Sequence, residues 1–262
     1  MSHHPRIVVV LPASTAAKTL EKTYADIPKD FVSKIILVDD VSQDKTVDVA
    51  RSLGLSVVIH IQNRGYGGNQ KTCYIEALKL GADIVVMLHP DHQYDSRLIP
   101  QLVQPIIDGK ADMVIGSRIM NGMALQGGMP FWKFVSNRVL TVLENVTYGR
   151  HLTDAHTGFR AFSRRLLTTV PFLLNSDDFV FDSQMIAQAI RFGFEIAEIP
   201  VQARYFPEAS SVNFRVSSIY GIKTLGVMMT FLLQKMRISH YAYLEKHLVD
   251  VVSRHHHSEI FR

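Results

Sequence analysis

The sequence predicts an α/β protein with a mainly parallel, twisted sheet in one domain, followed by a C-terminal helical appendage. Short runs of Val, Ile and Leu recur along the first half of the chain, and helical stretches of roughly 10–15 residues separate them, a spacing typical of right-handed crossovers between parallel strands. Each run ends in a polar loop, as expected where parallel strands carry a ligand crevice at their carboxyl ends. With 47% hydrophobic and 20% charged residues, the 262-residue chain can bury a full core.

The predicted strands are continuous apolar runs, which is the pattern of strands covered on both faces. The first run is rich in β-branched residues and stops at Pro12, and the second stops at Asp39 and Asp40. Strands are predicted at residues 7–11, 34–38, 55–61, 84–88, 113–115 and 194–201.

Helical segments are predicted between these strands and in the second half of the chain. Gly54, Gly81 and Gly193 are placed to cap three of them at the C-terminus. The segments cover residues 16–26, 45–53, the stretch from the 63–69 loop to residue 80, 131–146, 181–192 and 216–246. Because no linker, repeat or low-complexity tract separates the halves, we interpret residues 1–212 as one domain and 213–262 as a C-terminal helical segment.

Polar motifs follow the predicted strands at the point where each strand ends. Pro12 and Ser14, Asp39 and Asp40, the loop 63–69, the turn around Asp91 and residues 116–118 each come after one apolar run. Parallel strands bring their carboxyl ends to one edge, so these motifs are expected to share one crevice. Taken alone, Asp39 and Asp40 are equally explained as caps of the helix that follows them.

The most informative turn is Met-Leu-His-Pro-Asp-His-Gln-Tyr-Asp at residues 87–95. The oxygen atoms of Asp91 and Gln93 are hard ligands of the kind that bind a divalent cation next to a diphosphate. An ordinary exposed turn after a buried strand is the alternative interpretation.

Charge, cysteine content and hydropathy exclude several classes of protein. A net charge of +4 does not predict a nucleic-acid-binding protein, although it favours contact with an anionic membrane surface. The single cysteine, Cys73, excludes an internal disulfide framework and is typical of a cytoplasmic protein. We find no pattern of a secretory signal, and no run approaches the roughly 18 apolar residues of a spanning helix.

The predicted helix 216–246 contains an uncharged run, residues 224–233, which Lys223, Lys235 and Arg237 flank. Basic flanks beside a short apolar run are typical of a helix that lies at the membrane surface, on the cytoplasmic face. The alternative is a helix that packs on the main domain or on a second subunit, as in a homo-oligomer. Both interpretations remain open at this point.

Five motifs, in this order, resemble those of the family-two nucleotide-sugar glycosyltransferases. Residues 38–46 are similar to V-D-D-G-S-x-D-x-T, residues 63–70 to the N-x-G-x-G-x-A loop, and residues 87–95 to the D-x-D-x-Q turn. Residues 116–118 and 154–160 resemble the G-S-R and D-x-x-T/S-G-F-R motifs of the polyprenyl-phosphate sugar synthases, a branch that includes dolichyl-phosphate mannosyltransferase and glucosyltransferase.

The ordered match runs from residue 7 to residue 211, with two departures. Pro-Ala-Ser-Thr-Ala at residues 12–16 replaces the usual P-A-Y-N-E, and His89 stands in place of the first Asp of D-x-D. Imidazole is a better partner for Mn²⁺ than for Mg²⁺, so the second departure favours a shifted metal preference or a lower affinity.

The resemblance implies a Rossmann-like domain of the GT-A type that binds a nucleotide-diphospho-sugar across its strand ends. It places Mg²⁺ or Mn²⁺ on Asp91, Gln93 and His89, and it gives the reaction itself to Asp91, Asp154 and Arg160. The residues that it assigns to the nucleotide are Pro12, Ser14, Asp39, Asp40, Asn63, Gly67 and Gln70. The residues that it assigns to an acceptor phosphate are Arg118, Lys133, Ser136 and Arg204.

The activity implied is metal-dependent, inverting transfer of a hexose to a polyprenyl-phosphate acceptor. A phosphate acceptor is already anionic and hardly needs a general base. Two alternatives stay open: transfer to a saccharide hydroxyl with Asp154 as the base, and a nucleotide-sugar-binding module whose chemistry was lost. Asp154 is equally explained as a residue that orients Arg160.

Overall fold

The computed structural model describes residues 4–120, 122, 124, 125, 127–205 and 214–246. The predicted boundary between residues 212 and 213, and the part of the C-terminal segment from residue 247 onward, lie outside the described residues.

The core of the protein is a seven-stranded sheet with the strand order β3-β2-β1-β4-β6-β5-β7. Neighbouring strands pair in parallel except around β6, which is antiparallel to both β4 and β5. The mainly parallel sheet predicted from the sequence is therefore confirmed. The strands are β1 (Ile7–Ala13), β2 (Lys34–Asp39), β3 (Ser56–Ile59), β4 (Ile84–Met87), β5 (Met113–Ser117), β6 (Arg160–Ser163) and β7 (Ile196–Pro200).

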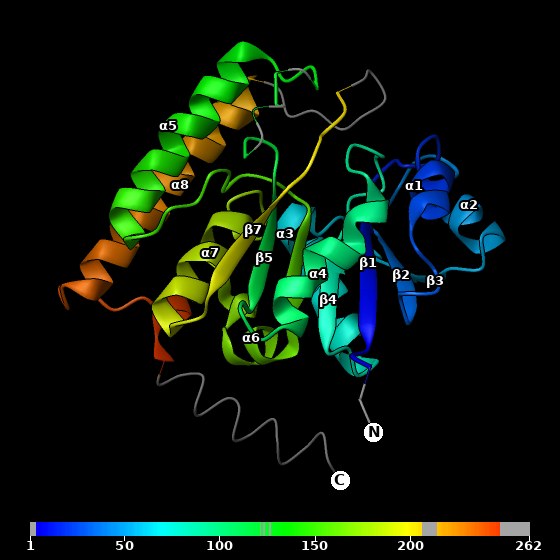
Figure 1. The fold of residues 1–262 in the computed structure, drawn as a ribbon, viewed down its shortest axis with the longest axis horizontal. Coiled ribbons are helices and arrows are strands. Elements are labelled where there is room, and N and C mark those ends of the chain that lie inside the picture. The colour runs from blue at the N-terminus through cyan, green and yellow to red at the C-terminus, as the bar shows by residue number, and fades with distance from the viewer. Residues whose placement is uncertain (1–3, 121, 123, 126, 206–213, 247–262) are drawn as a thin grey trace, which may run out of the picture.

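Helices cover both faces of the sheet (Figure 1). Alternate residues of a strand point to opposite faces, so Val8 and Val10 of β1 join one apolar layer while Val9 and Leu11 join the other. The first layer lies under α3, α6, α7 and α8, and the second under α1, α2 and α4. The helices are α1 (Leu20–Asp26), α2 (Thr46–Ser52), α3 (Gly65–Lys79), α4 (Ile99–Ile107), α5 (Phe131–Tyr148), α6 (Arg164–Thr169), α7 (Phe181–Phe192) and α8 (Phe214–Lys235), with 3₁₀ turns at Ser96–Leu98, Phe172–Leu174 and Ala242–Leu244.

The long helices α5 and α8 lie side by side at the margin of the domain, where α8 also packs on α7 (Figure 1). The predicted extent of α8 was wrong at its C-terminus: the helix ends at Lys235, not at residue 246. Arg237 takes a left-handed conformation (φ 60°), and the N–H of Ile238 donates to the carbonyl of Leu233, a pattern that closes a helix.

The expectation that no segment approaches a spanning helix was also wrong. Residues Arg215–Lys235 are long and apolar enough to cross a membrane by length and composition, because uncharged Ser, Thr and Gly residues extend the apolar run. A helix of this kind is also common in soluble cores, so length and composition alone do not assign it to a membrane.

Candidate active site

The strand ends surround an open cavity of about 650 Å³, a volume typical of small-molecule sites. Loops that follow β1, β2, β4 and β5 form its wall together with parts of α5 and α8. The predicted site residues that line it are Pro12, Ser14, Asp40, Asn63, His89, Asp91, Gln93, Arg118, Lys133 and Ser136. The predicted residues that lie behind or beside it are Asp39, Gly67, Gln70, Asp154, Arg160 and Arg204.

Asp40 lies at the cavity wall directly after β2 and closes the N-terminus of α3. Its Oδ1 accepts the backbone N–H of Arg64 (2.8 Å), and its Oδ2 accepts that of Gly65 (3.0 Å). Nδ1 of His60 lies 2.8 Å from the same Oδ1. These are N–H groups that a helix leaves unpaired at its N-terminus. Asp40 therefore caps α3, not the helix that follows it in the sequence, and its contact with a nucleotide stays a prediction.

Three other predicted nucleotide residues hold the loops around the cavity. Asn63 Oδ1 accepts the N–H of Gly65 (3.0 Å), and the Gly67 N–H donates to the Asp177 carbonyl (2.8 Å). A side chain at Gly67 would collide with the Ser176 carbonyl oxygen, so glycine is needed there for close approach of two chain segments. Gln70 is fully buried and donates to Asp182 Oδ1 (3.1 Å).

Asp39 also acts locally. Its Oδ2 accepts the N–H of Ser42 (3.1 Å), and the hydroxyl of Ser42 accepts the N–H of Thr15 (2.9 Å). Asp39 thus links the loop after β2 to the loop after β1, where Pro12 and Ser14 line the cavity.

The acidic turn after β4 places His89, Asp91 and Gln93 on the cavity wall. Oδ1 of Asp91 accepts the backbone N–H of Gln93 (3.1 Å), which fixes the turn. The His89 ring stacks on Tyr66 with ring centroids 5.4 Å apart, and its Nε2 lies 3.2 Å from the Tyr66 hydroxyl. A Cβ at Gly158 would come within 2.6 Å of the His89 ring, so His89 packs closely on both sides.

The donor set of this turn suits a cation that a substrate helps to bind. Within the described part of the chain, three or more His, Cys, Asp or Glu side chains do not gather into one metal-binding group. Mg²⁺ and Mn²⁺ at diphosphate sites need only one or two protein carboxylates, because phosphate oxygens and water complete the coordination. Asp91 at the cavity wall meets this requirement.

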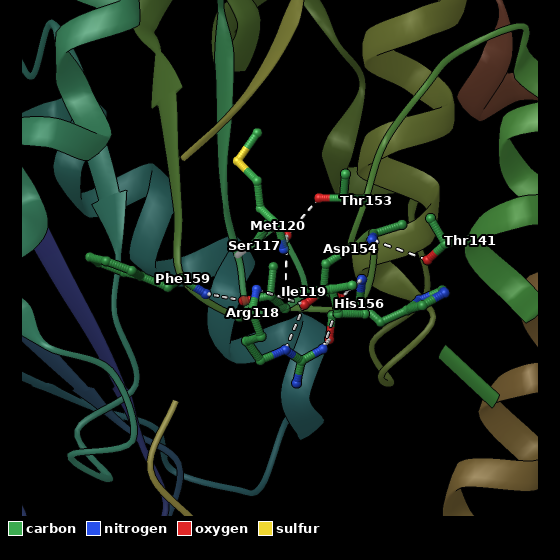
Figure 2. A network of polar contacts seen from close by, with 12 residues as sticks. Ser117, Arg118, Ile119, Met120, Thr141, Thr153, Asp154, His156 and Phe159 are labelled. Carbon is green, nitrogen blue, oxygen red and sulfur yellow. Dashed lines mark hydrogen bonds and ion pairs between the residues drawn. The ribbon is translucent and has the colours of Figure 1, made fainter. Parts of the chain in front are cut away.

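Arg118 and Asp154 form a buried ion pair behind the wall of the cavity (Figure 2). Nε of Arg118 donates to Oδ2 (2.7 Å) and Nη2 donates to Oδ1 (2.9 Å), and the Arg118 backbone N–H adds a third contact (3.1 Å). Burial alone raises the pKa of the Asp154 carboxyl, but the charge and hydrogen bonds of Arg118 outweigh it and hold that pKa below its usual range. Asp154 therefore orients Arg118, and not Arg160 as the sequence suggested.

Lys133 and Ser136 of α5 reach the cavity beside Arg118. Nζ of Lys133 lies 5.5 Å from the centre of the Tyr205 ring, and Nη1 of Arg118 donates to the Tyr205 hydroxyl (3.3 Å). Burial, and then the charge of Arg118, lowers the pKa of Lys133. The hydroxyl of Ser136 donates to the Trp132 carbonyl (2.8 Å). Two cations thus adjoin the cavity at its α5 end.

The structure does not bring Arg160 or Arg204 to the cavity wall. Arg160 is fully buried, and its guanidinium donates to the carbonyls of Thr157 (2.7 Å), Ala155 (3.0 Å) and Asp182 (3.1 Å). Arg204 is exposed, and its backbone N–H donates to the Gln93 carbonyl (2.9 Å). In these positions Arg160 and Arg204 support loops. The geometry does not place Arg160 at the reacting groups or Arg204 at an acceptor phosphate, which were the roles predicted for them.

Several residues that the sequence did not single out also line the cavity. Tyr66 donates to Asp182 Oδ2 (2.8 Å), and His156 Nδ1 lies 2.7 Å from the Tyr220 hydroxyl. Asp182 begins α7 and Tyr220 lies on α8, so each comes from a segment remote from the strand-end motifs. The additional lining residues include Tyr66, Asn69, Tyr94, Trp132, Asn137, His156, Phe179, Asp182 and Tyr220. The sequence signal for Asp182 was its position near a helix N-terminus, and acidic residues are too common at such positions to indicate a functional site.

The mainly parallel sheet, the cavity at its strand ends and the acidic turn after β4 define a glycosyltransferase of the GT-A fold class. Residues 8–170, more than half of the chain, match the family described as Glycosyl transferase family 2. The chain belongs to glycosyltransferase family 2, which confirms the resemblance found in its motifs.

Similar proteins come from archaea and bacteria. A protein of uncharacterised function from Methanocaldococcus jannaschii is 32% identical over 219 residues, which cover 84% of this chain and 89% of that protein. The UDP-N-acetylglucosamine–dolichyl-phosphate N-acetylglucosaminyltransferase of Methanococcus voltae is 29% identical, covering 76% of this chain and 86% of the relative. The polyprenol monophosphomannose synthase of Mycolicibacterium smegmatis is 25% identical, covering 64% and 65%.

Among solved structures, glucosyl-3-phosphoglycerate synthase from Mycobacterium tuberculosis in complex with Mg²⁺ and uridine diphosphate has a TM-score of 0.67 and 20% identity. The match covers 87% of this chain and 79% of that one. At this level of identity the likeness establishes the fold alone.

Proposed function

We propose that the protein is a metal-dependent, inverting hexosyltransferase that moves a sugar from a nucleotide-diphospho-sugar to a polyprenyl-phosphate acceptor. Family membership makes the chain a glycosyltransferase, which sets aside the binding-module alternative. The names of the relatives from M. voltae and M. smegmatis include dolichyl phosphate and polyprenol, which supports a lipid-phosphate acceptor here.

The observation that carries the proposal is the pair of cations, Arg118 and Lys133, at the α5 end of the cavity. Asp154 balances the charge of Arg118, so the charge of Lys133 beside it is the one that an anionic ligand in the cavity would offset. The lowered pKa of Lys133 is consistent with a group that gains from such an anion. An acceptor phosphate supplies this charge, whereas a saccharide hydroxyl does not.

The carboxylates near the cavity give a second reason to prefer an anionic acceptor. A hydroxyl acceptor requires a general base with an accessible oxygen. Both oxygens of Asp154 bind Arg118, and those of Asp182 accept hydrogen bonds from Tyr66 and Gln70. Asp40 is committed to the N-terminus of α3. A phosphate needs no base, so these commitments do not impede its reaction.

The donor is proposed to lie between the loops after β1 and β2 and the acidic turn. Pro12, Ser14 and Asn63 would contact the nucleoside, and Asp91 with Gln93 would hold Mg²⁺ or Mn²⁺. When bound, the cation neutralises charge that develops on the nucleoside diphosphate as it leaves. His89 beside Asp91 favours Mn²⁺, because imidazole is a softer ligand than carboxylate.

The side-by-side helices α5 and α8 are proposed to face the membrane that holds the acceptor. Each carries a stripe of exposed apolar side chains with helical spacing: Phe131, Val135, Val139, Val142 and Val146 on α5, and Ile219, Ile222, Leu225 and Met229 on α8. The cavity reaches this pair of helices through Trp132 and Val216. A lipid tail leaving the cavity would meet this apolar surface, which supports the proposal of a peripheral protein at the cytoplasmic face of the membrane.

The test is a transfer assay with purified protein, Mn²⁺ and a panel of UDP- and GDP-hexoses. Short-chain polyprenyl phosphate in detergent, the matching polyprenol and a soluble disaccharide serve as three acceptors. Sugar transfer to the phosphate, with none to the polyprenol, is the expected result. Transfer to the disaccharide, with the lipid phosphate inert, would overturn the proposed acceptor. Hydrolysis of the donor without acceptor identifies the active nucleotide-sugar independently of that outcome.

A further inference from the structure

A buried carboxyl group lies behind the α5 end of the cavity. Glu144, on α5, has an exposed fraction of 0%, and its carboxyl group lies beside Ser183 without a hydrogen bond of good geometry in the described part of the chain. Its Oε2 lies 3.4 Å from Nε2 of His156. A buried carboxylate without partners is costly, and burial raises the pKa of Glu144 to about 8. Glu144 is therefore an uncharged carboxylic acid at neutral pH.

The neighbour of Glu144 is uncharged as well. Burial lowers the pKa of His156 to about 4, so its imidazole is neutral and carries one N–H and one acceptor nitrogen. Nδ1 of His156 lies 2.7 Å from the Tyr220 hydroxyl. An O–H of Glu144 directed at Nε2, 3.4 Å away, would leave the N–H of His156 on Nδ1, from which it would donate to Tyr220.

These contacts continue into a chain that joins three helices. The Tyr220 hydroxyl of α8 lies 3.0 Å from the Ser183 hydroxyl of α7, which lies 3.2 Å from Thr224 of α8. On the other side, the His156 carbonyl accepts a hydrogen bond from Arg118 Nη2 (3.0 Å). His156 and Tyr220 both line the cavity. The chain therefore connects the buried Glu144 to the wall on which Arg118 is placed.

Packing alone does not explain a carboxyl group at this position. An apolar side chain of similar volume would fill the space between α5, α7 and α8 without leaving polar atoms unpaired, and such replacements are often neutral or stabilising. We propose that Glu144 is a positioning residue: as an uncharged acid it orients the His156 ring and thereby holds Tyr220 of α8 on the cavity wall. This inference rests on the proposed function only in treating that wall as the acceptor end.

Ionisation of Glu144 removes the O–H on which this arrangement depends. The charged or titratable groups that face it are His156 from the 154–158 turn, Arg160 from β6, Tyr148 from its own helix and Tyr220 from α8. Arg160 stays charged, and burial raises the pKa of both tyrosines. Within this set, Glu144 is the group that changes charge between pH 7 and pH 9.

The stability effect has a definite sign. The pKa of Glu144 is about 8 in the folded protein and near 4.5 in the unfolded chain, so the folded state retains the proton over this interval. His156, with a pKa of about 4 in the folded protein and 6.5 in the unfolded chain, opposes this effect up to about pH 6.5. The free energy of unfolding should therefore fall mainly as pH rises from about 6.5 to 8, by up to about 1.4 kcal/mol per pH unit. At pH 9 about nine molecules in ten carry ionised Glu144, so the apparent KM for a polyprenyl phosphate should rise about tenfold between pH 7 and 9.

The chain has a single tryptophan, Trp132, which lines the cavity on α5 and reports on this wall without any substrate. We expect its fluorescence to change with a midpoint near pH 8 in the natural protein. Glu144→Gln keeps an N–H donor and cannot ionise, so this variant should lack the transition and keep normal activity at pH 7. Lys133 also titrates on the alkaline side, and it is present in both proteins. Glu76→Gln, the same change on α3, is the matched control and should behave as the natural protein.

A second variant and a direct measurement complete the test. Tyr220→Phe keeps Glu144 but removes the hydroxyl that receives the His156 N–H, so it should raise the acceptor KM at pH 7 and leave Mn²⁺–nucleotide affinity unchanged.

Infrared difference spectra should show a protonated carboxyl band that disappears between pH 7 and 9 and is missing in Glu144→Gln. A fluorescence transition that keeps its full size and midpoint in Glu144→Gln, or a natural protein without the infrared band at pH 7, would overturn the proposal. Because fluorescence and infrared need no acceptor, such a failure is distinguishable from failure of the proposed reaction.

Discussion

The Arg118–Asp154 pair carries two opposite charges into the interior of the protein from positions 36 residues apart in the sequence. The D-x-x-T-G-F-R motif placed Asp154 and Arg160 close together in the sequence, so a pair between them was one of two interpretations of Asp154. The fold instead directs Asp154 toward the loop after β5, while backbone carbonyls satisfy Arg160. A motif thus predicted which residues gather near the cavity but not which of them would bind one another, because that depends on strand pairing.

Replacing one partner of this pair should reduce the stability of the protein far more than replacing both partners. Arg118→Met leaves a buried carboxylate, and Asp154→Leu leaves a buried guanidinium, so each single variant should lose about 3–5 kcal/mol of stability. The double variant should recover much of that loss, because neither charge remains unpaired. Urea unfolding followed by circular dichroism measures all three. Arg97→Ala, which breaks an exposed pair with Asp95, is the control and should leave the stability nearly unchanged. Additive losses in the double variant would contradict this account.

Asp91 is the residue whose metal role can be tested most directly. Asp91→Ala should weaken Mn²⁺-dependent binding of uridine or guanosine diphosphate at least about tenfold, or about 1.4 kcal/mol, because it removes the carboxylate proposed to hold the metal beside the diphosphate. Titration calorimetry with and without Mn²⁺ measures this change. Asp95→Ala alters a carboxylate four residues away that caps the 3₁₀ turn Ser96–Leu98, and it should leave the affinity intact. Equal affinities of Asp91→Ala and the natural protein would remove Asp91 from the metal site.

Among the secondary-structure elements, the sequence predicted six of the seven strands and missed β6. Strand β6 reads Arg-Ala-Phe-Ser, and it is a strand because β4 and β5 pair with it on both sides. No local sequence pattern predicts such a strand. The end of α8 was missed for a related reason, because the turn at Arg237 requires a left-handed conformation that side chains of this type adopt uncommonly.

Adding one methyl group to a helical glycine should change the stability of the protein in opposite directions at Gly67 and Gly226. Gly67→Ala should destabilise the protein by roughly 1–3 kcal/mol, because its Cβ would meet the Ser176 carbonyl and push α3 from the segment before α7. Gly226→Ala lies in α8 with open space around the added carbon, and it should stabilise by about 0.5–1 kcal/mol. Thermal and urea unfolding of the two variants provide the comparison. A neutral Gly67→Ala would mean that the close approach of these segments is not required.

At the scale of the whole molecule, the surfaces proposed for the donor, the acceptor and the membrane follow one another along the protein. The strand-end loops form one end of the cavity, Arg118 and Lys133 adjoin it near α5, and the apolar stripes of α5 and α8 begin where the cavity ends. The sequence left membrane and subunit contact open for the C-terminal helix alone. It did not indicate that α5 carries a second stripe beside it, because only the fold brings these helices together (Figure 1).

The membrane assignment is testable with one pair of matched variants. Ile222 on α8 is 70% exposed and Ile61, after β3, is 101% exposed, so each can be changed to Glu without loss of core packing. The natural protein should bind vesicles of phosphatidylcholine with phosphatidylglycerol, and added salt should weaken binding because α8 carries Lys223 within the stripe and Lys235 at its end. Ile222→Glu should weaken binding at least about tenfold, since burial of one Ile side chain contributes roughly 1.5–3 kcal/mol. Ile61→Glu should bind as the natural protein does.

The alternative is that this surface contacts a second subunit. In that case the natural protein would sediment as a dimer, Ile222→Glu would be a monomer, and neither form would bind vesicles. This outcome would contradict the membrane contact.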